Sequence, residues 1–159
     1  MKTLGGLDAI NGLLLAPPVH IPDEKGGAYK TELSLIRTMD RAEKIIWWHG
    51  SDPRTEPHNH PWPFESSILS GGYTEHRWWK ENGVWKTDTV IYRAGNINKV
   101  DSNVFHVVVN VQPETVTHVV CGKNNDNKWG YLDLNLEYIP AKPEAKFREA
   151  LLSLNPHLR

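Results

Sequence analysis

Two histidines and a glutamate lie close together in a proline-rich stretch of the sequence. His58 and His60 are separated by one residue, so on an extended chain both side chains leave by the same face. Glu65 follows the loop 61–64. Two imidazoles and a carboxylate suit a divalent transition metal, and such a set leaves coordination positions open for small ligands. The alternative is that both histidines are solvated loop residues.

A third histidine, His106, lies in an apolar run. Residues 105–111 are mostly β-branched, which indicates a buried strand rather than a loop. From a strand, His106 can supply another imidazole across a barrel. The sequence therefore predicts a metal site made of His58, His60, Glu65 and His106.

The spacing of the first stretch resembles the first motif of the cupin family. The matches are His58, His60, Glu65 after four residues, and Gly72 after six more. The leading glycine of that motif is absent, because Asp52 stands at its position.

The second stretch is similar to the second cupin motif. Gly95, His106 and Asn110 match in register, whereas Asp101 replaces the proline of the motif and Asn103 replaces its middle glycine. Because asparagine tolerates the left-handed conformation, Asn103 is expected to keep the turn. Both motifs agree in register independently, and the resemblance implies a metal bound by the four predicted ligands.

The resemblance implies an all-β fold, an antiparallel double-sheet jelly-roll barrel with an N-terminal arm and a short C-terminal helix. We expect residues 1–32 to form an arm or short helix on the barrel, 33–138 the cupin barrel, and 139–159 the helix and tail. Helical spacing of Phe147, Leu151 and Leu154 predicts that helix over residues 144–154.

Alternation and turn signals predict the strands of the barrel. An Asn82-Gly83 pair is typical of a tight hairpin between two of them. The expected strands are 33–40, 44–49, 66–79 with a bulge at Gly71-Gly72, 85–93, 105–111, 116–121 and 129–136.

Polar residues on the central strands are candidates for binding a substrate. Tyr73, Glu75 and Arg77 share one face of the expected strand, and Arg93 lies on its hairpin partner. These four residues are the predicted substrate-binding set at the barrel mouth. The alternative is that they lie on a solvated strand face.

Bulk composition limits the classes of partner. The chain has 159 residues and a formal net charge of −1, which favours one domain and gives no general attraction to nucleic acid or membrane. The lone Cys121 gives no disulfide framework and indicates a reducing, cytoplasmic compartment. An N-terminal arm that packs on a second subunit would make a homodimer, and this alternative stays open.

Three functions are compatible with the predicted site. A metal-dependent oxygenase acting on a small polar molecule ranks first, since the wider superfamily favours it. A metal-dependent isomerase or lyase and a non-catalytic, ligand-binding cupin are the alternatives. Iron(II) is the natural choice for oxygen chemistry, and manganese, nickel or zinc would also accept these ligands.

Overall fold

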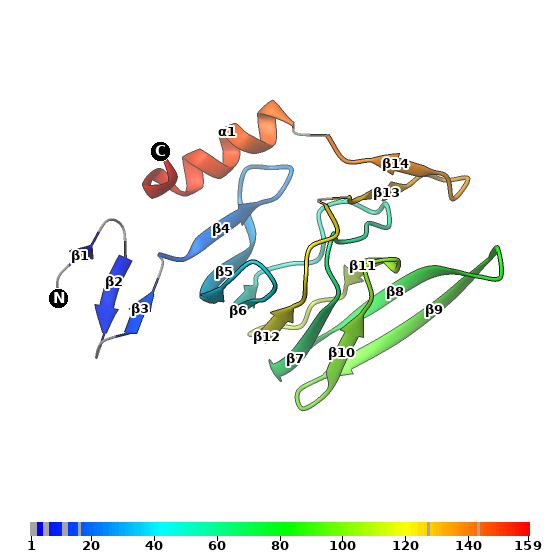
Figure 1. The fold of residues 1–159 in the computed structure, drawn as a ribbon, viewed down its shortest axis with the longest axis horizontal. Coiled ribbons are helices and arrows are strands. Elements are labelled where there is room, and N and C mark those ends of the chain that lie inside the picture. The colour runs from blue at the N-terminus through cyan, green and yellow to red at the C-terminus, as the bar shows by residue number, and fades with distance from the viewer. Residues whose placement is uncertain (1–2, 5–6, 11–12, 16, 127, 143) are drawn as a thin grey trace.

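The computed structural model describes residues 3–4, 7–10, 13–15, 17–126, 128–142 and 144–159. Strands dominate, with one helix near the C-terminus (Figure 1). The elements are β1 (Thr3–Leu4), β2 (Leu7–Ile10), β3 (Leu13–Leu15), β4 (Val19–Pro22), β5 (Ala28–Arg37), β6 (Ala42–Trp48), β7 (Phe64–Ser70), β8 (Gly72–Glu81), β9 (Val84–Arg93), β10 (Ile97–Val100), β11 (Phe105–Val109), β12 (Val116–Cys121), β13 (Gly130–Leu132), β14 (Tyr138–Pro140), α1 (Ala145–Leu154) and the 3-10 turn η1 (Pro156–Leu158).

Two antiparallel sheets form the body of the protein. The larger sheet has the order β10-β7-β12-β6-β5-β4, and the smaller has the order β11-β8-β9. Strands β4, β5 and β6 are consecutive in sequence, whereas β12 comes from far along the chain and lies between β6 and β7. This arrangement confirms the predicted all-β, double-sheet jelly roll with a short C-terminal helix.

Alternation along the strands decides which side chains enter the interior. Ile46, Val119 and Cys121 form one buried cluster, and Ile68, Tyr73 and Val108 form another. The first cluster lies on the larger sheet, whereas the second joins β7 of the larger sheet to β8 and β11 of the smaller, so side chains of both sheets meet in the core. Cys121 packs in the first cluster as a small hydrophobic residue.

The N-terminal part differs from the expected arm or short helix. Strands β1, β2 and β3 form a small antiparallel sheet of their own, and residues 1–2, 5–6, 11–12 and 16 of this expected arm lie outside the described residues. Strand β4 pairs with β5 from Val19 onward, so the large sheet begins before residue 33.

The C-terminal helix α1 packs against β4 (Figure 1). Asn155 at the end of α1 is fully buried, and its side-chain amide exchanges two 2.7 Å hydrogen bonds with the backbone of His20. These bonds hold the helix on the edge strand of the large sheet.

Three local expectations are corrected by the structure. The run 129–136 contains only the short strand β13, and β14 follows after a turn at Asp133. Strand β10 was not predicted. Asn103 keeps the expected turn, in which the Val104 N–H donates to the Asp101 carbonyl at 3.0 Å, but not through the expected left-handed conformation, since its φ is not positive. Asn110 has the positive φ, at 51°.

Gly71 and Gly72 form a corner between the two sheets instead of a bulge within one strand. Strand β7 ends in the larger sheet, and β8 begins in the smaller. Gly71 has a φ of 65°, and a Cβ added there would lie 2.2 Å from Thr115 Oγ1 and 2.7 Å from Thr115 Cα. Only glycine meets both requirements at this corner.

We predict that Gly71→Ala destabilises the protein more than Gly83→Ala. Both glycines have a positive φ, but a Cβ at Gly83 meets nothing within 4 Å. Gly83→Ala should cost about 1–2 kcal/mol of unfolding free energy, and Gly71→Ala a further 1–3 kcal/mol, roughly, from overpacking against Thr115. Urea unfolding of the two variants measures the difference, and equal costs would contradict the corner assignment.

Candidate metal centre

Backbone pairing brings the histidine pair to β11. The His58 N–H donates to the His106 carbonyl at 3.0 Å, and the His106 N–H donates back to the His58 carbonyl at 2.8 Å. On its other side, His58 forms an isolated bridge to Tyr131 of β13. The loop that carries the two histidines is thereby fixed as an additional extended segment between β11 and β13.

The three imidazoles converge on one point. Ligand nitrogens of His58, His60 and His106 all lie within 4.8 Å of one another. The Nε2 atoms of His60 and His106 are 3.0 Å apart. Among the described residues this is the cluster of histidine, cysteine and carboxylate groups able to hold a metal ion.

The 3.0 Å separation of the His60 and His106 nitrogens fits a shared metal ion. Imidazole nitrogens bind zinc at about 2.0–2.1 Å, so two of them lie about 3.0 Å apart at a right angle and about 3.4 Å apart at the tetrahedral angle. Three imidazoles are a donor set that zinc, copper, iron and nickel accept. Without a metal, the same separation allows a hydrogen bond between the two rings.

Burial keeps two of the three rings in the ligand-competent form. Desolvation lowers the pKa of both His58 and His60 well below the ordinary value of 6.5, and any positive charge on His106 lowers it further. Neutral imidazole carries the lone pair that a metal requires. The site is therefore prepared for a cation at neutral pH.

Glu75 of β8 fixes the third ring. Its carboxylate is completely buried and accepts a hydrogen bond from His106 Nδ1 at 2.5 Å, which leaves Nε2 of that ring toward the cluster. Burial alone would raise the pKa of Glu75, but the His106 hydrogen bond and the Arg77 charge lower it below its ordinary value. Such a carboxylate–histidine pair sets the tautomer of a metal ligand.

A polar network holds Glu75 in turn. Arg77 Nε donates to the carboxylate at 2.6 Å, and Asn98 Nδ2 donates to the same oxygen at 3.1 Å. Asn98 also donates to the Tyr73 hydroxyl at 3.0 Å, and Arg77 donates to the Tyr92 hydroxyl at 2.8 Å. The sequence identified Tyr73, Glu75 and Arg77 as one face but not as a support for His106.

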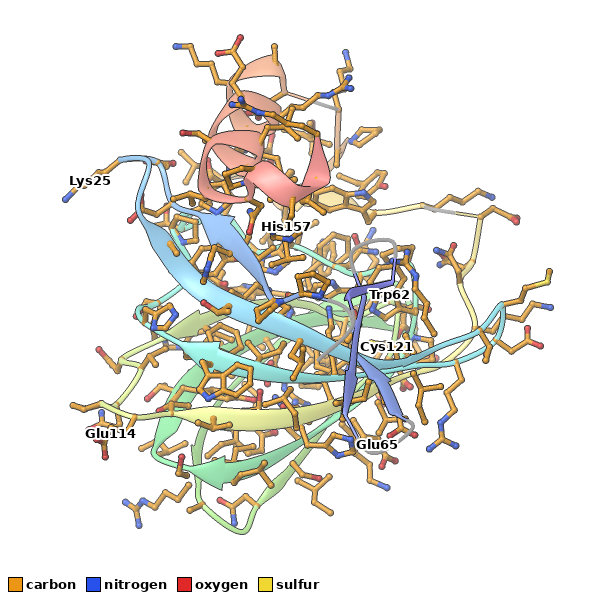
Figure 2. All side chains as sticks on the ribbon, turned by 90° about the vertical axis from the view of Figure 1, so that its left-hand side faces the viewer. Lys25, Trp62, Glu65, Glu114, Cys121 and His157 are labelled. Carbon is orange, nitrogen blue, oxygen red and sulfur yellow. The ribbon has the colours of Figure 1, made fainter. Side chains whose placement is uncertain are left out.

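The structure does not bring the predicted ligand Glu65 to the cluster. Phe64 packs its ring against His60 and His106, at centroid distances of 5.3 and 5.7 Å. Because side chains alternate along β7, the next residue leaves by the outer face. Glu65 is exposed and pairs with Lys99 at 3.0 Å. In Figure 2 it lies well below Trp62, whose ring stacks beside His60 at 6.2 Å.

Arg93, the fourth predicted substrate residue, also lies away from the histidines. It is exposed at the end of β9, opposite Gly72 at the corner. It lines a surface depression of about 550 Å³ together with Tyr73, Tyr92 and Gln112. That depression contains none of the three histidines, so the structure separates Arg93 from the candidate metal centre.

Sequence reasoning missed a second polar group in the interior. Lys30, Glu32 and Lys44 lie on β5 and β6, with side chains that are only 16%, 17% and 21% exposed. The sequence contains a signal for this group, because Lys30 and Glu32 are two residues apart and share a face of an extended strand. The prediction began the first barrel strand at residue 33 and therefore left both residues outside it.

Comparison with solved structures identifies the fold. A putative mannose-6-phosphate isomerase from Ralstonia eutropha JMP134 is 15% identical with a TM-score of 0.50, over 59% of this chain and 84% of that chain. Streptomyces albus HEPD with 2-hydroxyethylphosphonate and Fe(II) bound is 10% identical with a TM-score of 0.50, over 68% and 24%. An RmlC-like cupin from Shewanella frigidimarina NCIMB 400 is 20% identical with a TM-score of 0.42, over 68% and 86%. The neighbours are cupin-fold proteins, as the two sequence motifs predicted.

Comparison of the sequence itself gave a negative result. No protein-family model matches it, and no curated protein matches it.

In the part of the chain that the structure describes, no helix has the length and apolar character needed to cross a membrane.

We predict that the metal-free protein loses stability as the pH falls below about 6.5. The folded pKa of His58 and His60 lies below the unfolded value, so acid protonates the unfolded chain first and draws the equilibrium toward it. The contribution of the two histidines to the free energy of unfolding should be fully present above pH 6.5. Below this pH it should decrease by up to about 1.4 kcal/mol per pH unit for each histidine. Urea midpoints of chelator-treated protein at pH 7.5 and 5.5 measure the loss.

The double variant His58→Gln/His60→Gln should show a smaller pH effect than the wild type. Exposed His157 provides the matched control, because His157→Gln should leave the wild-type loss unchanged. Equal pH dependence in all three proteins would contradict the assignment.

We also predict that Glu75→Gln weakens metal binding by about 10–100-fold while the protein stays folded, because the neutral amide no longer enforces the His106 tautomer. Competition with a chromogenic chelator measures the affinity. Glu65→Gln removes an equal charge from the outer face and should have no effect. Unchanged affinity in the Glu75 variant would exclude its role in positioning His106.

Proposed function

We propose that this cupin-fold protein is a metal-dependent enzyme acting on a small polar molecule in the barrel. The observation that carries the proposal is the convergence of three imidazoles from two segments of the chain, with 3.0 Å between the nitrogens of His60 and His106, which are 46 residues apart. Desolvated, neutral imidazoles that meet at one point are suited to bind a divalent cation, which histidines of a solvated loop are not.

Each residue of the proposed centre has a separate task. His58, His60 and His106 would hold the ion, and Glu75 positions His106 through its Nδ1–H. Rings of Phe64 and Trp62 cover the histidines on one side and limit the access of water there. The ion, when bound, supplies a Lewis acid with coordination positions left for substrate.

Within this class, an iron(II) oxygenase is the first candidate. Three neutral nitrogen ligands accept iron(II), and manganese, nickel or zinc remain alternatives. The HEPD neighbour with Fe(II) bound supports iron(II) as the metal, whereas the putative mannose-6-phosphate isomerase neighbour supports an isomerase. A cytoplasmic location, supported by the lone buried Cys121, and a homodimer stay predictions.

We predict that His58→Ala and His106→Ala each reduce bound metal from about one ion per chain to near zero, because two remaining imidazoles bind a divalent ion weakly. Glu65→Ala should retain the metal, since its carboxylate lies on the outer face. Elemental analysis after metal loading and desalting measures all three. Retention by both histidine variants would contradict the site, and loss in Glu65→Ala would restore the ligand set predicted from sequence.

The reaction class is tested with iron(II)-loaded protein prepared without oxygen. Oxygen consumption in the presence of small organic acids and sugars, absent from His106→Ala, would support the oxygenase. Conversion of a substrate without oxygen uptake would replace it with an isomerase or lyase. Failure of the wild-type protein to bind any divalent metal would overturn the metal-dependent function.

A further inference from the structure

The second polar group, Lys30, Glu32 and Lys44, lies on the inner face of the large sheet. Glu32 pairs in register with Ile46, a buried core residue, and side chains of registered neighbours share a face. Lys30 is two residues from Glu32 and therefore points to the same side. The side chains of the group are mostly buried, but about a fifth of the surface of each remains exposed to solvent.

One carboxylate is shared by the two lysines. Lys30 Nζ lies 3.1 Å from Glu32 Oε1, and Lys44 Nζ lies 2.8 Å from Glu32 Oε2. Both cations hold the pKa of Glu32 at about 2 in spite of its burial, so it stays ionised. Each ammonium has three N–H donors, and Glu32 accepts one from each. The group thus carries a surplus positive charge with donors that Glu32 does not use.

This group and the histidines belong to the same interior. Lys44 is in register with Val119, which is in register with Ser66 of β7. Two residues before Ser66, on the same face, Phe64 contacts His60. The charges of Lys30 and Lys44 also act on His60, whose pKa they lower after burial and the neighbouring histidines.

A bound divalent metal leaves this interior positive. Among the described residues, the inward cations Lys30, Lys44 and Arg77 face the carboxylates of Glu32, Glu75 and Asp52. The formal charges of these six groups balance without metal. The three histidines are neutral ligands, and Glu65 is outside, so the double charge of the ion is uncompensated. Low dielectric inside the barrel makes an anionic ligand favourable.

We infer, on the basis of the function proposed above, that the barrel binds a small organic anion. Its carboxylate or phosphoryl group pairs with Lys30 and Lys44, while the rest of the molecule reaches the three histidines. The aromatic rings of Tyr29 and Trp48 lie 5.3 and 5.4 Å from Lys30 Nζ and hold that cation in place.

Calorimetric titration of metal-loaded protein tests this inference. Malonate and inorganic phosphate are the probes, with glycerol as the neutral control, and the two anions distinguish carboxylate from phosphoryl recognition. At least one anion should bind. Lys30→Met and Lys44→Met should weaken that binding about 10–100-fold, because each removes a charge-assisted hydrogen bond. Glu32→Gln should tighten binding, because it removes the competing carboxylate.

Lys99→Met is the matched control. Lys99 pairs with Glu65 on the outer face and is 71% exposed, so the same loss of charge there should not change the affinity. The rise in affinity for Glu32→Gln keeps the test decisive if a lysine variant does not fold, since a purely structural ion pair predicts no rise. Failure of both anions to bind, or unchanged affinity in all three interior variants, would overturn the inference.

Metal content of every variant separates this result from the proposed function. If metal is held but the anions do not bind, only the inference fails. If no metal is held, the metal-dependent function fails, and the same titrations on metal-free protein still report whether Lys30 and Lys44 form an anion site.

Discussion

The buried hydrogen bond between Glu75 and His106 is the interaction on which the candidate centre depends. A carboxylate with no solvent exposure needs compensation, and at 2.5 Å from Nδ1 it receives it from the ring that faces the other two histidines. Arg77 and Asn98 supply the remaining donors. The same carboxylate thus satisfies its own burial and sets the direction of a metal-ligand lone pair, so stability and function use one contact.

Backbone hydrogen bonds hold the loop that carries His58 and His60 in the interior. Segment 57–59 has hydrogen bonds to β11 on one side and to the β13 region on the other, including Leu132 N–H to the Pro57 carbonyl at 2.8 Å. Asn59 is buried and accepts from the Gly130 N–H at 2.8 Å. A loop with backbone hydrogen bonds at both edges is ordered like a strand, so His58 is held in place by pairing and His60 follows two residues later.

The strand pattern was largely predictable, and the errors have physical causes. Strand β12 was predicted with its observed ends, since alternating β-branched residues have few competing conformations. Glu65 was predicted as a ligand from its spacing, but spacing does not define the phase of β7 relative to the core. Phe64 and Ser66 occupy the inner face of β7. Burying an aromatic ring stabilises the fold, whereas burying an unpaired carboxylate destabilises it.

The sequence by itself determined the fold class, most of the strands and three histidines suited to a metal, because alternation, turn chemistry and ligand type are local properties. Tertiary structure decided the rest. Glu75 became the partner of His106, Glu65 was excluded, and Lys30, Glu32 and Lys44 came to share the interior with the histidines. These outcomes depend on how two sheets face each other, and a one-residue change of phase along any strand would reverse them.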